Sequence, residues 1–190
     1  MSAGKGCGKI LLTGAAGFIG RRILGMLVSM GKPVVALDQR FMGADVGEAG
    51  QVLSVEGSLE DERLIVSLMR RVDAVCHVAG FIPPDYTNSA FAEKCVRVNG
   101  LCTLSLAKAA AEAGVNRFVY LSTGALYVNP DRSVVEEDAV YPADEATFYS
   151  AGKLLGEIYV EHFRRQGLLQ SLTLRLGSVY GPGMPLRSAI

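Results

Sequence analysis

The chain has 190 residues, 49% of them hydrophobic, and its 19 basic residues balance 19 acidic ones. This length and composition suit one globular domain with a real core. Zero net charge argues against a nucleic-acid surface, and no apolar run reaches the roughly 18 residues that span a membrane. The four cysteines form no CxxC pair and have no partnering histidine cluster, so we expect no metal site and a reducing, cytoplasmic location.

Short apolar runs alternate along the chain with segments of helical spacing. We expect strands at residues 9–13, 33–37, 52–56, 72–78, 117–122 and 171–175. Helices are expected near residues 19–27 and 64–69, with Ser58 as the cap that opens the second, and two longer ones at 90–113 and 147–165. Continuous apolar strands that alternate with helices predict an α/β fold, in which a parallel sheet is covered on both faces.

A glycine-rich turn joins the first expected strand to the first helix. In LLTGAAGFIG, Gly14 suits a tight turn, Gly17 lets backbone approach a pyrophosphate, and Gly20 lets the helix pack closely on the sheet. The helix N-terminus offers free N–H groups to phosphates. Asp38 follows the second strand, where a carboxylate binds ribose hydroxyls and disfavours a 2′-phosphate. We therefore expect NAD rather than NADP, although Arg21 and Arg40 lie close enough in sequence to approach such a phosphate.

A tyrosine and a lysine four residues apart, Tyr149 and Lys153, lie on the last long helix. Their spacing places both side chains on one helix face, one turn apart. Such a pair also arises by chance, so the surrounding motifs decide its meaning.

Several motifs occur in the order typical of one family. With Tyr149 and Lys153, they make the chain resemble the extended short-chain dehydrogenases/reductases, the NAD-dependent epimerase/dehydratase family. The likeness runs from Lys9 to Gly183. The other motifs are TGxxGxxG at the first turn, VCHVAG at residues 75–80, Asn99, LSTGALY at 121–127 and LRLGSVYGPG at 174–183.

The resemblance implies a Rossmann-type doubly wound sheet of order 3-2-1-4-5-6 and a hydride-transfer site. Tyr149 would be the acid/base, its pKa lowered by Lys153, and Thr123 would hold the substrate oxygen. His77 and His162 are expected to be structural. The expected cofactor-binding residues are Gly14, Gly17, Phe18, Ile19, Gly20, Asp38, Ser58, Leu59, Val78, Ala79, Gly80, Asn99 and Lys153.

The chain departs from the family pattern at several places. Ser58 stands where the family often has an aspartate for the adenine amine. Gly152 and Gly156 replace a serine and an alanine in the active-site helix, at a cost of about 0.5–1 kcal/mol each in helix propensity. Ser178 replaces the asparagine that contacts a sugar, which puts a nucleotide-sugar substrate in doubt. Residues 124 and 125 provide no acid after Thr123, which disfavours dehydration.

The resemblance also bears on domains and partners. We expect residues 1–8 to form a flexible tail and residues 9–190 a cofactor-binding domain, truncated because family members carry a C-terminal substrate lobe that is largely absent here. The expected function is an NAD-dependent oxidoreductase or epimerase acting on a small-molecule secondary alcohol or ketone, a nucleotide sugar or a steroid-like ring. The alternative is a non-catalytic NAD(P) sensor, scaffold or inactive fragment. A homodimer through the two long helices is also expected.

Overall fold

The computed structural model describes residues 8–41, 50–127, 133 and 146–184. Most of the expected N-terminal tail, residues 1–7, therefore lies outside the described residues. The described chain contains a six-stranded parallel sheet of order β3-β2-β1-β4-β5-β6, which confirms the predicted topology. Its strands are β1 (Ile10–Thr13), β2 (Val34–Asp38), β3 (Val52–Glu56), β4 (Ala74–His77), β5 (Arg117–Thr123) and β6 (Ser171–Leu176).

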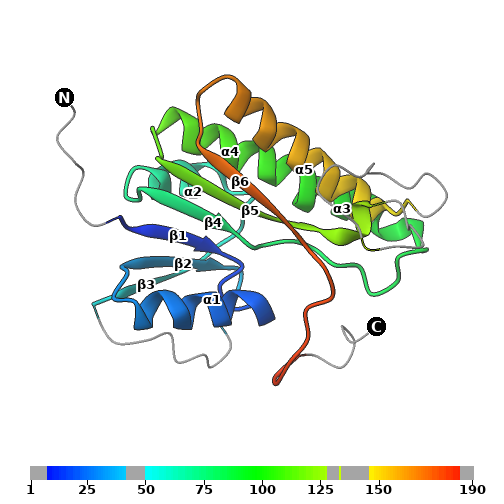
Figure 1. Ribbon diagram of the computed structural model, residues 1–190, viewed down its shortest axis with the longest axis horizontal. Helices are drawn as coiled ribbons and strands as arrows, with labels where there is room; N and C mark the ends of the chain where they lie inside the picture. Colours follow the sequence, from blue (N-terminus) through cyan, green and yellow to red (C-terminus); the bar gives the residue numbers. More distant parts are fainter. Residues whose placement is uncertain (1–7, 42–49, 128–132, 134–145, 185–190) are drawn as a thin grey trace.

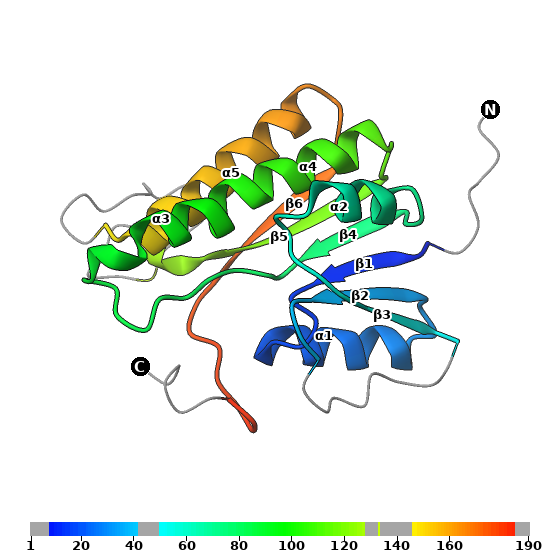
Figure 2. The same cartoon turned by 180° about the vertical axis from the view of Figure 1, so that it is seen from behind.

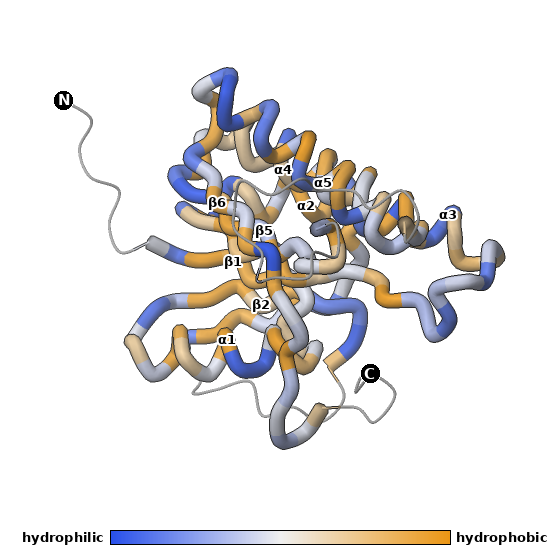
Figure 3. Tube along the Cα trace, turned by 45° about the vertical axis from the view of Figure 1, so that its right-hand side comes forward, coloured by the Kyte–Doolittle hydropathy of each residue, from blue (hydrophilic) through white to orange (hydrophobic). Residues whose placement is uncertain are grey.

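Helices cover the two faces of the sheet unequally (Figures 1 and 2). Helix α1 (Phe18–Ser29) packs on one face through a core that includes Leu12, Leu24 and Val34. Helices α2 (Glu62–Met69), α4 (Cys102–Glu112) and α5 (Phe148–Arg165) pack on the other face. Hydrophobic residues follow the strands between these layers (Figure 3). None of the described helices combines the length and apolar character that crossing a bilayer requires.

The long helix expected at residues 90–113 is a composite of four segments. It contains η1 (Ser89–Phe91), α3 (Ala92–Cys95), the π-helix η2 (Val96–Leu101) and α4. Hydrophobic spacing could not reveal this, because a π-turn inserts one residue without changing which residue types are used. Asn99 and Gly100 are the buried residues of the π-helix, and both face α5 or the edge of the sheet.

The expected cap of the second helix was wrong. Asp61, not Ser58, is the N-cap of α2, and its carboxylate accepts a hydrogen bond from the Leu64 amide at 3.0 Å. The Ser58 hydroxyl instead accepts from the Glu60 amide at 3.1 Å. Both residue types are good caps, and the path of the chain after β3 decides between them.

Two glycines that looked like a cost to α5 have a packing role. A Cβ at Gly152 would lie 2.6 Å from the Cys95 carbonyl oxygen, and a Cβ at Gly156 would collide with the Tyr120 hydroxyl. The missing side chains therefore let α5 lie directly on the π-helix and on β5. This close approach offsets the lower helix propensity.

Candidate active site

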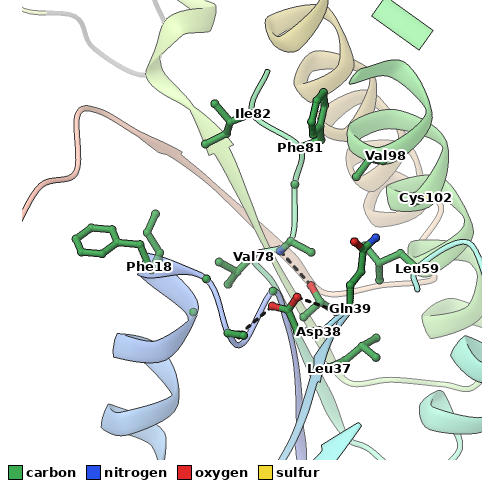
Figure 4. A pocket seen from close by; sticks show the side chains of 18 of the residues that line it. Phe18, Leu37, Asp38, Gln39, Leu59, Val78, Phe81, Ile82, Val98 and Cys102 are labelled. Atoms are coloured by element: carbon green, nitrogen blue, oxygen red, sulfur yellow. Dashed lines mark hydrogen bonds between the residues drawn. The ribbon is translucent and has the colours of Figure 1, made fainter. Parts of the chain in front are cut away.

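A cavity of about 700 Å³ lies along the edge where the strands end, within the size range of ligand sites. Figure 4 shows Asp38 near its centre, with Phe18 on one side and Leu59, Val98 and Cys102 on the other. Thirteen of the predicted site residues line it: Gly14, Gly17, Phe18, Ile19, Gly20, Asp38, Ser58, Leu59, Val78, Ala79, Gly80, Thr123 and Tyr149. The remaining two, Asn99 and Lys153, lie directly behind Gly80.

The turn before α1 is built from glycine backbone. Gly14 has φ +70°, and a Cβ there would lie 2.7 Å from Ala79 backbone atoms. A Cβ at Gly20 would overlap the Gly14 carbonyl oxygen. Gly17 is the N-cap of α1 and provides no side-chain cap, so the first N–H groups of the helix keep their hydrogen-bonding capacity. This part of the cavity is a cradle that side chains would fill.

The Asp38 carboxylate is fixed at the end of β2. One oxygen accepts from the Ala16 amide at 2.9 Å, and the other accepts from the Gln39 amide at 2.7 Å. Each oxygen retains a lone pair, because a carboxylate has about four acceptor positions. Arg21 and Arg40 also line the cavity, as the sequence suggested.

The neighbouring part of the cavity is mostly apolar. Leu59 follows β3, Val98 and Cys102 come from the helical segments after β4, and Gln39 follows β2. Burial raises the pKa of the Cys102 thiol to about 11, so it stays protonated and acts as a small apolar group. The apolar side chains here suit contact with the faces of a base.

Thr123 and Tyr149 lie together at the other end of the cavity. Burial raises the pKa of Tyr149 to about 12, the nearby Tyr86 adds to this, and a hydrogen bond with Thr123 opposes it. The Thr123 hydroxyl also accepts from the Ala125 amide at 3.2 Å. The expected lowering of the tyrosine pKa by Lys153 is therefore wrong in this structure, because desolvation of the phenolate dominates.

Lys153 is buried behind the cavity wall. Its ammonium donates to the Leu121 carbonyl at 2.6 Å and lies 4.6 Å from the centroid of the Tyr120 ring. Burial lowers its pKa from 10.5 to about 8, while Glu157 one turn along α5 raises it. The same atom would lie 3.6 Å from a Cβ placed on Gly80.

Asn99 holds the turn that follows β4. Its side-chain oxygen accepts from the Phe81 amide at 2.7 Å, and its side-chain nitrogen donates to the Phe81 carbonyl at 2.9 Å. The predicted asparagine thus lies beside the predicted loop. It supports the loop from behind and does not line the cavity.

Sequence reasoning missed Ser122. Its hydroxyl is buried, lines the cavity beside Thr123, and has no hydrogen-bond partner in the described part of the chain. Nothing in the sequence singled out Ser122, because Thr123 was already assigned as the catalytic hydroxyl of the LSTGALY motif. Other missed lining residues are Gln39, Phe81, Ile82, Lys94, Val98 and Met184, which belong to no motif, and Leu176 and Val179, which lie in the motif at 174–183 but were not singled out.

These features fit a dinucleotide. The glycine cradle suits a diphosphate, Asp38 suits a ribose, and the orphaned Ser122 hydroxyl suits a polar group that enters at the far end. Among the described residues, no three His, Cys, Asp or Glu side chains gather as metal ligands would.

Comparisons with known proteins agree with this geometry. A family model described as "NAD dependent epimerase/dehydratase family" matches residues 10–189, which confirms the resemblance seen in the sequence. A UDP-glucose 4-epimerase from Azospirillum brasilense is 33% identical over 91% of this chain and 49% of its own length. A UDP-glucose 4-epimerase from Mycolicibacterium smegmatis is 32% identical over 92% of this chain and 57% of its own.

Solved structures show the same fold. MoeE5 in complex with UDP-glucose and NAD has a TM-score of 0.80 and 31% identity, over 94% of this chain and 57% of that one. The Thermus thermophilus UDP-glucose 4-epimerase complex with NAD also has a TM-score of 0.80, with 28% identity, over 95% of this chain and 59% of that one. The chain spans about half the length of the relatives it matches.

Proposed function

Because the chain belongs to the NAD-dependent epimerase/dehydratase family, we propose that it binds NAD along the carboxyl edge of its sheet and serves hydride transfer at a secondary alcohol or ketone. One observation carries the proposal: a single cavity joins the glycine cradle and Asp38 to Thr123 and Tyr149. When bound, NAD supplies the hydride acceptor or donor. The protein's residues hold it and move the proton.

The residues divide the work by position. The turn at Gly14–Gly20 would hold the diphosphate, Asp38 the adenosine ribose, and Lys153 and Ser122 the opposite end. Tyr149 is a protonated phenol at neutral pH, since burial raises its pKa to about 12. It is therefore ready to give a proton to a ketone oxygen. Taking a proton from an alcohol would require a nearby positive charge, which Lys153 carries below its pKa of about 8.

The relatives support a nucleotide sugar over a steroid-like ring as the substrate. Two are UDP-glucose 4-epimerases, and MoeE5 was solved with UDP-glucose. Ser178 in place of the asparagine is the feature that opposes this choice. Gly124 and Ala125 after Thr123 provide no acid to expel water, so we propose oxidation or epimerisation rather than dehydration.

The cofactor proposal is tested by calorimetry with NAD and NADP. NAD at 100 times its dissociation constant should stabilise the fold by about 2.7 kcal/mol. Asp38→Ala should abolish this protection, while Asp38→Asn, which keeps an oxygen for the Ala16 amide, should bind weakly and discriminate less between NAD and NADP. No protection of the wild-type chain by either cofactor would refute the proposal.

Turnover is tested separately with a panel of UDP-sugars and secondary alcohols, following NAD reduction and sugar epimerisation. Tyr149→Phe should lose activity and retain NAD binding. A Tyr149→Phe protein as active as the wild type would remove the assigned acid/base. NAD binding without turnover on any substrate would favour the sensor or scaffold alternative.

We also propose a homodimer through α5 and the π-helix beside it. Leu101 and Ile158 are 48% and 53% exposed on these segments and offer apolar surface that a second copy could cover. Light scattering should give twice the chain mass, and Leu101→Lys with Ile158→Lys should give the monomer. A wild-type monomer at micromolar concentration would contradict this. The cytoplasmic location stays a prediction.

A further inference from the structure

A chain of hydrogen bonds runs from the cavity lining into the protein behind it, through His77 and Thr103, which the proposed function does not use. It starts at the Ala79 amide, which donates to the Thr13 hydroxyl at 3.3 Å. The Thr13 hydroxyl lies 2.8 Å from His77 Nδ1. The strand end before the glycine cradle is thereby connected to the strand end before Gly80.

The chain continues on the other side of the imidazole. His77 Nε2 lies 2.9 Å from the Thr103 hydroxyl, which donates to the Asn99 carbonyl at 2.7 Å. The Asn99 side chain then makes its two hydrogen bonds to Phe81. Ala79 and Phe81 flank Gly80, so the hydrogen bonds close a ring around the turn at residues 79–81.

One protonation state of His77 satisfies this ring. Thr103 has a single hydroxyl proton, and the Asn99 carbonyl takes it. Thr103 must therefore accept from His77, which requires a proton on Nε2. Nδ1 is then a bare acceptor for the Thr13 hydroxyl proton. The opposite tautomer would leave the Nε2 lone pair facing an oxygen with no proton to give.

The surrounding residues keep the His77 imidazole neutral and fix its position. His77 is fully buried between the sheet and the helices, stacked on Tyr120 with centroids 5.5 Å apart and edge-on to Phe118 at 6.2 Å. Burial, with the positive charge of Lys153, lowers the pKa of His77 to about 3. The imidazole is thus a fixed bridge and not a pH switch.

The turn that this ring encloses fits tightly against the cofactor cradle. A Cβ on Gly14 would lie only 2.7 Å from Ala79 backbone atoms. A Cβ on Gly80 would lie 3.1 Å from the Asn99 side-chain oxygen. A small movement of the turn would therefore narrow the cavity or displace the cradle.

We propose that His77 is a positioning residue, a neutral Nε2–H bridge between Thr13 and Thr103 that sets the turn at residues 79–81 for dinucleotide binding. Its consequence is that NAD affinity depends on His77 and Thr103, neither of which lines the cavity. The inference rests on the proposed function only in taking NAD as the ligand.

The test compares two substitutions at one position. Thr103→Val removes the hydroxyl with little change of shape and should weaken NAD binding about tenfold, as expected for one lost buried hydrogen bond. Thr103→Ser keeps the hydroxyl and should bind as the wild type does. Val75→Ala, on β4 with His77 but outside the ring of hydrogen bonds, is the control for general loss of stability. His77→Phe should weaken binding similarly, and combining it with Thr103→Val should add little.

Two readouts do not need NAD. In ¹⁵N spectra near neutral pH, His77 should show the neutral Nε2–H tautomer, with His162 as the internal reference. Amide exchange at Ala79 and Phe81 should quicken in Thr103→Val and stay slow in Val75→Ala. If the wild-type chain does not bind NAD but shows the predicted tautomer and the predicted amide exchange, the proposed function is refuted. The bridging role of His77 is then still supported. The other tautomer, unchanged exchange, or an unchanged NAD affinity in Thr103→Val overturns the positioning role.

Discussion

The two ends of the cavity are built by different means. The end at Gly14–Gly20 is backbone, shaped by missing side chains and a positive φ, and the Asp38 carboxylate beside it is held by two amides. The end at Thr123, Tyr149 and Lys153 is built from side chains, and burial has moved the pKa values of two of them, Tyr149 and Lys153. Shape therefore governs the first end, and the cost of burying charge governs the second.

The largest effect should come from filling the backbone end. Gly14→Ala places a Cβ against Ala79 in a conformation that L-residues avoid, which combines about 1–2 kcal/mol of backbone strain with about 1–3 kcal/mol of overpacking. Denaturation and NAD titration should both show the loss. Gly25→Ala, in the open middle of α1, should instead stabilise by about 0.5–1 kcal/mol. Equal effects at the two positions would contradict the cradle.

The second prediction concerns Lys153 at the side-chain end, where a substitution should raise stability, in contrast to Gly14→Ala. Burial lowers the pKa of Lys153 from 10.5 to about 8, which corresponds to about 3 kcal/mol of destabilisation near neutral pH. Lys153→Met should recover part of this and abolish turnover. The adjacent Glu157 remains paired with Arg175 at 2.8 Å, so no unpaired carboxylate is left. A Lys153→Met protein that is less stable than the wild type would show that its hydrogen bond to Leu121 outweighs desolvation.

The third prediction tests whether the close packing of α5 on β5 at Gly156 also stabilises the side-chain end. Gly156→Ala should destabilise by about 1–3 kcal/mol, because the new methyl group meets the buried Tyr120 hydroxyl. Removing that hydroxyl with Tyr120→Phe should restore part of the loss, because the ring carbon Cζ still lies 2.8 Å from the new Cβ. Chemical denaturation of the single and double variants measures the coupling. Additive effects would mean that the two side chains do not compete for the space.

The smallest predicted effect is an acid dependence set by His77, behind the turn at residues 79–81. Burial lowers its folded pKa to about 3 from an ordinary value of 6.5, so the unfolded state binds the proton first. Its contribution to stability is full above pH 6.5 and is lost as pH falls toward 3. His77→Gln should flatten this slope in denaturation curves between pH 6.5 and 5. An unchanged slope would show that other groups dominate.

The sequence predicted the backbone end well, because three glycines at this spacing between a strand and a helix indicate one local geometry. TGAAGFIG, with Asp38 after the next strand, predicted the cradle and the carboxylate, and both ends of each of the six strands lie within two residues of the prediction. The π-helix, the Asp61 cap and the Ser122 hydroxyl escaped prediction. They depend on hydrogen-bond register and on which of two polar residues the folded chain buries.

The side-chain end was predicted in identity but not in electrostatics. Thr123, Tyr149 and Lys153 come together as the motif implied, yet the expected lowering of the tyrosine pKa is replaced by a rise. Helical spacing places a lysine near a tyrosine, but only tertiary packing determines how much water each one loses. The same reason hid the bridging role of His77.

A single measurement tests whether the two ends form one site: an NAD titration followed by ¹H–¹⁵N spectra of the backbone amides. Amides at Gly14, Gly17 and Asp38 should shift together with those at Ser122, Thr123 and Tyr149, with one common dissociation constant. Shifts confined to one end, or none at saturating NAD, would contradict a dinucleotide that spans the cavity.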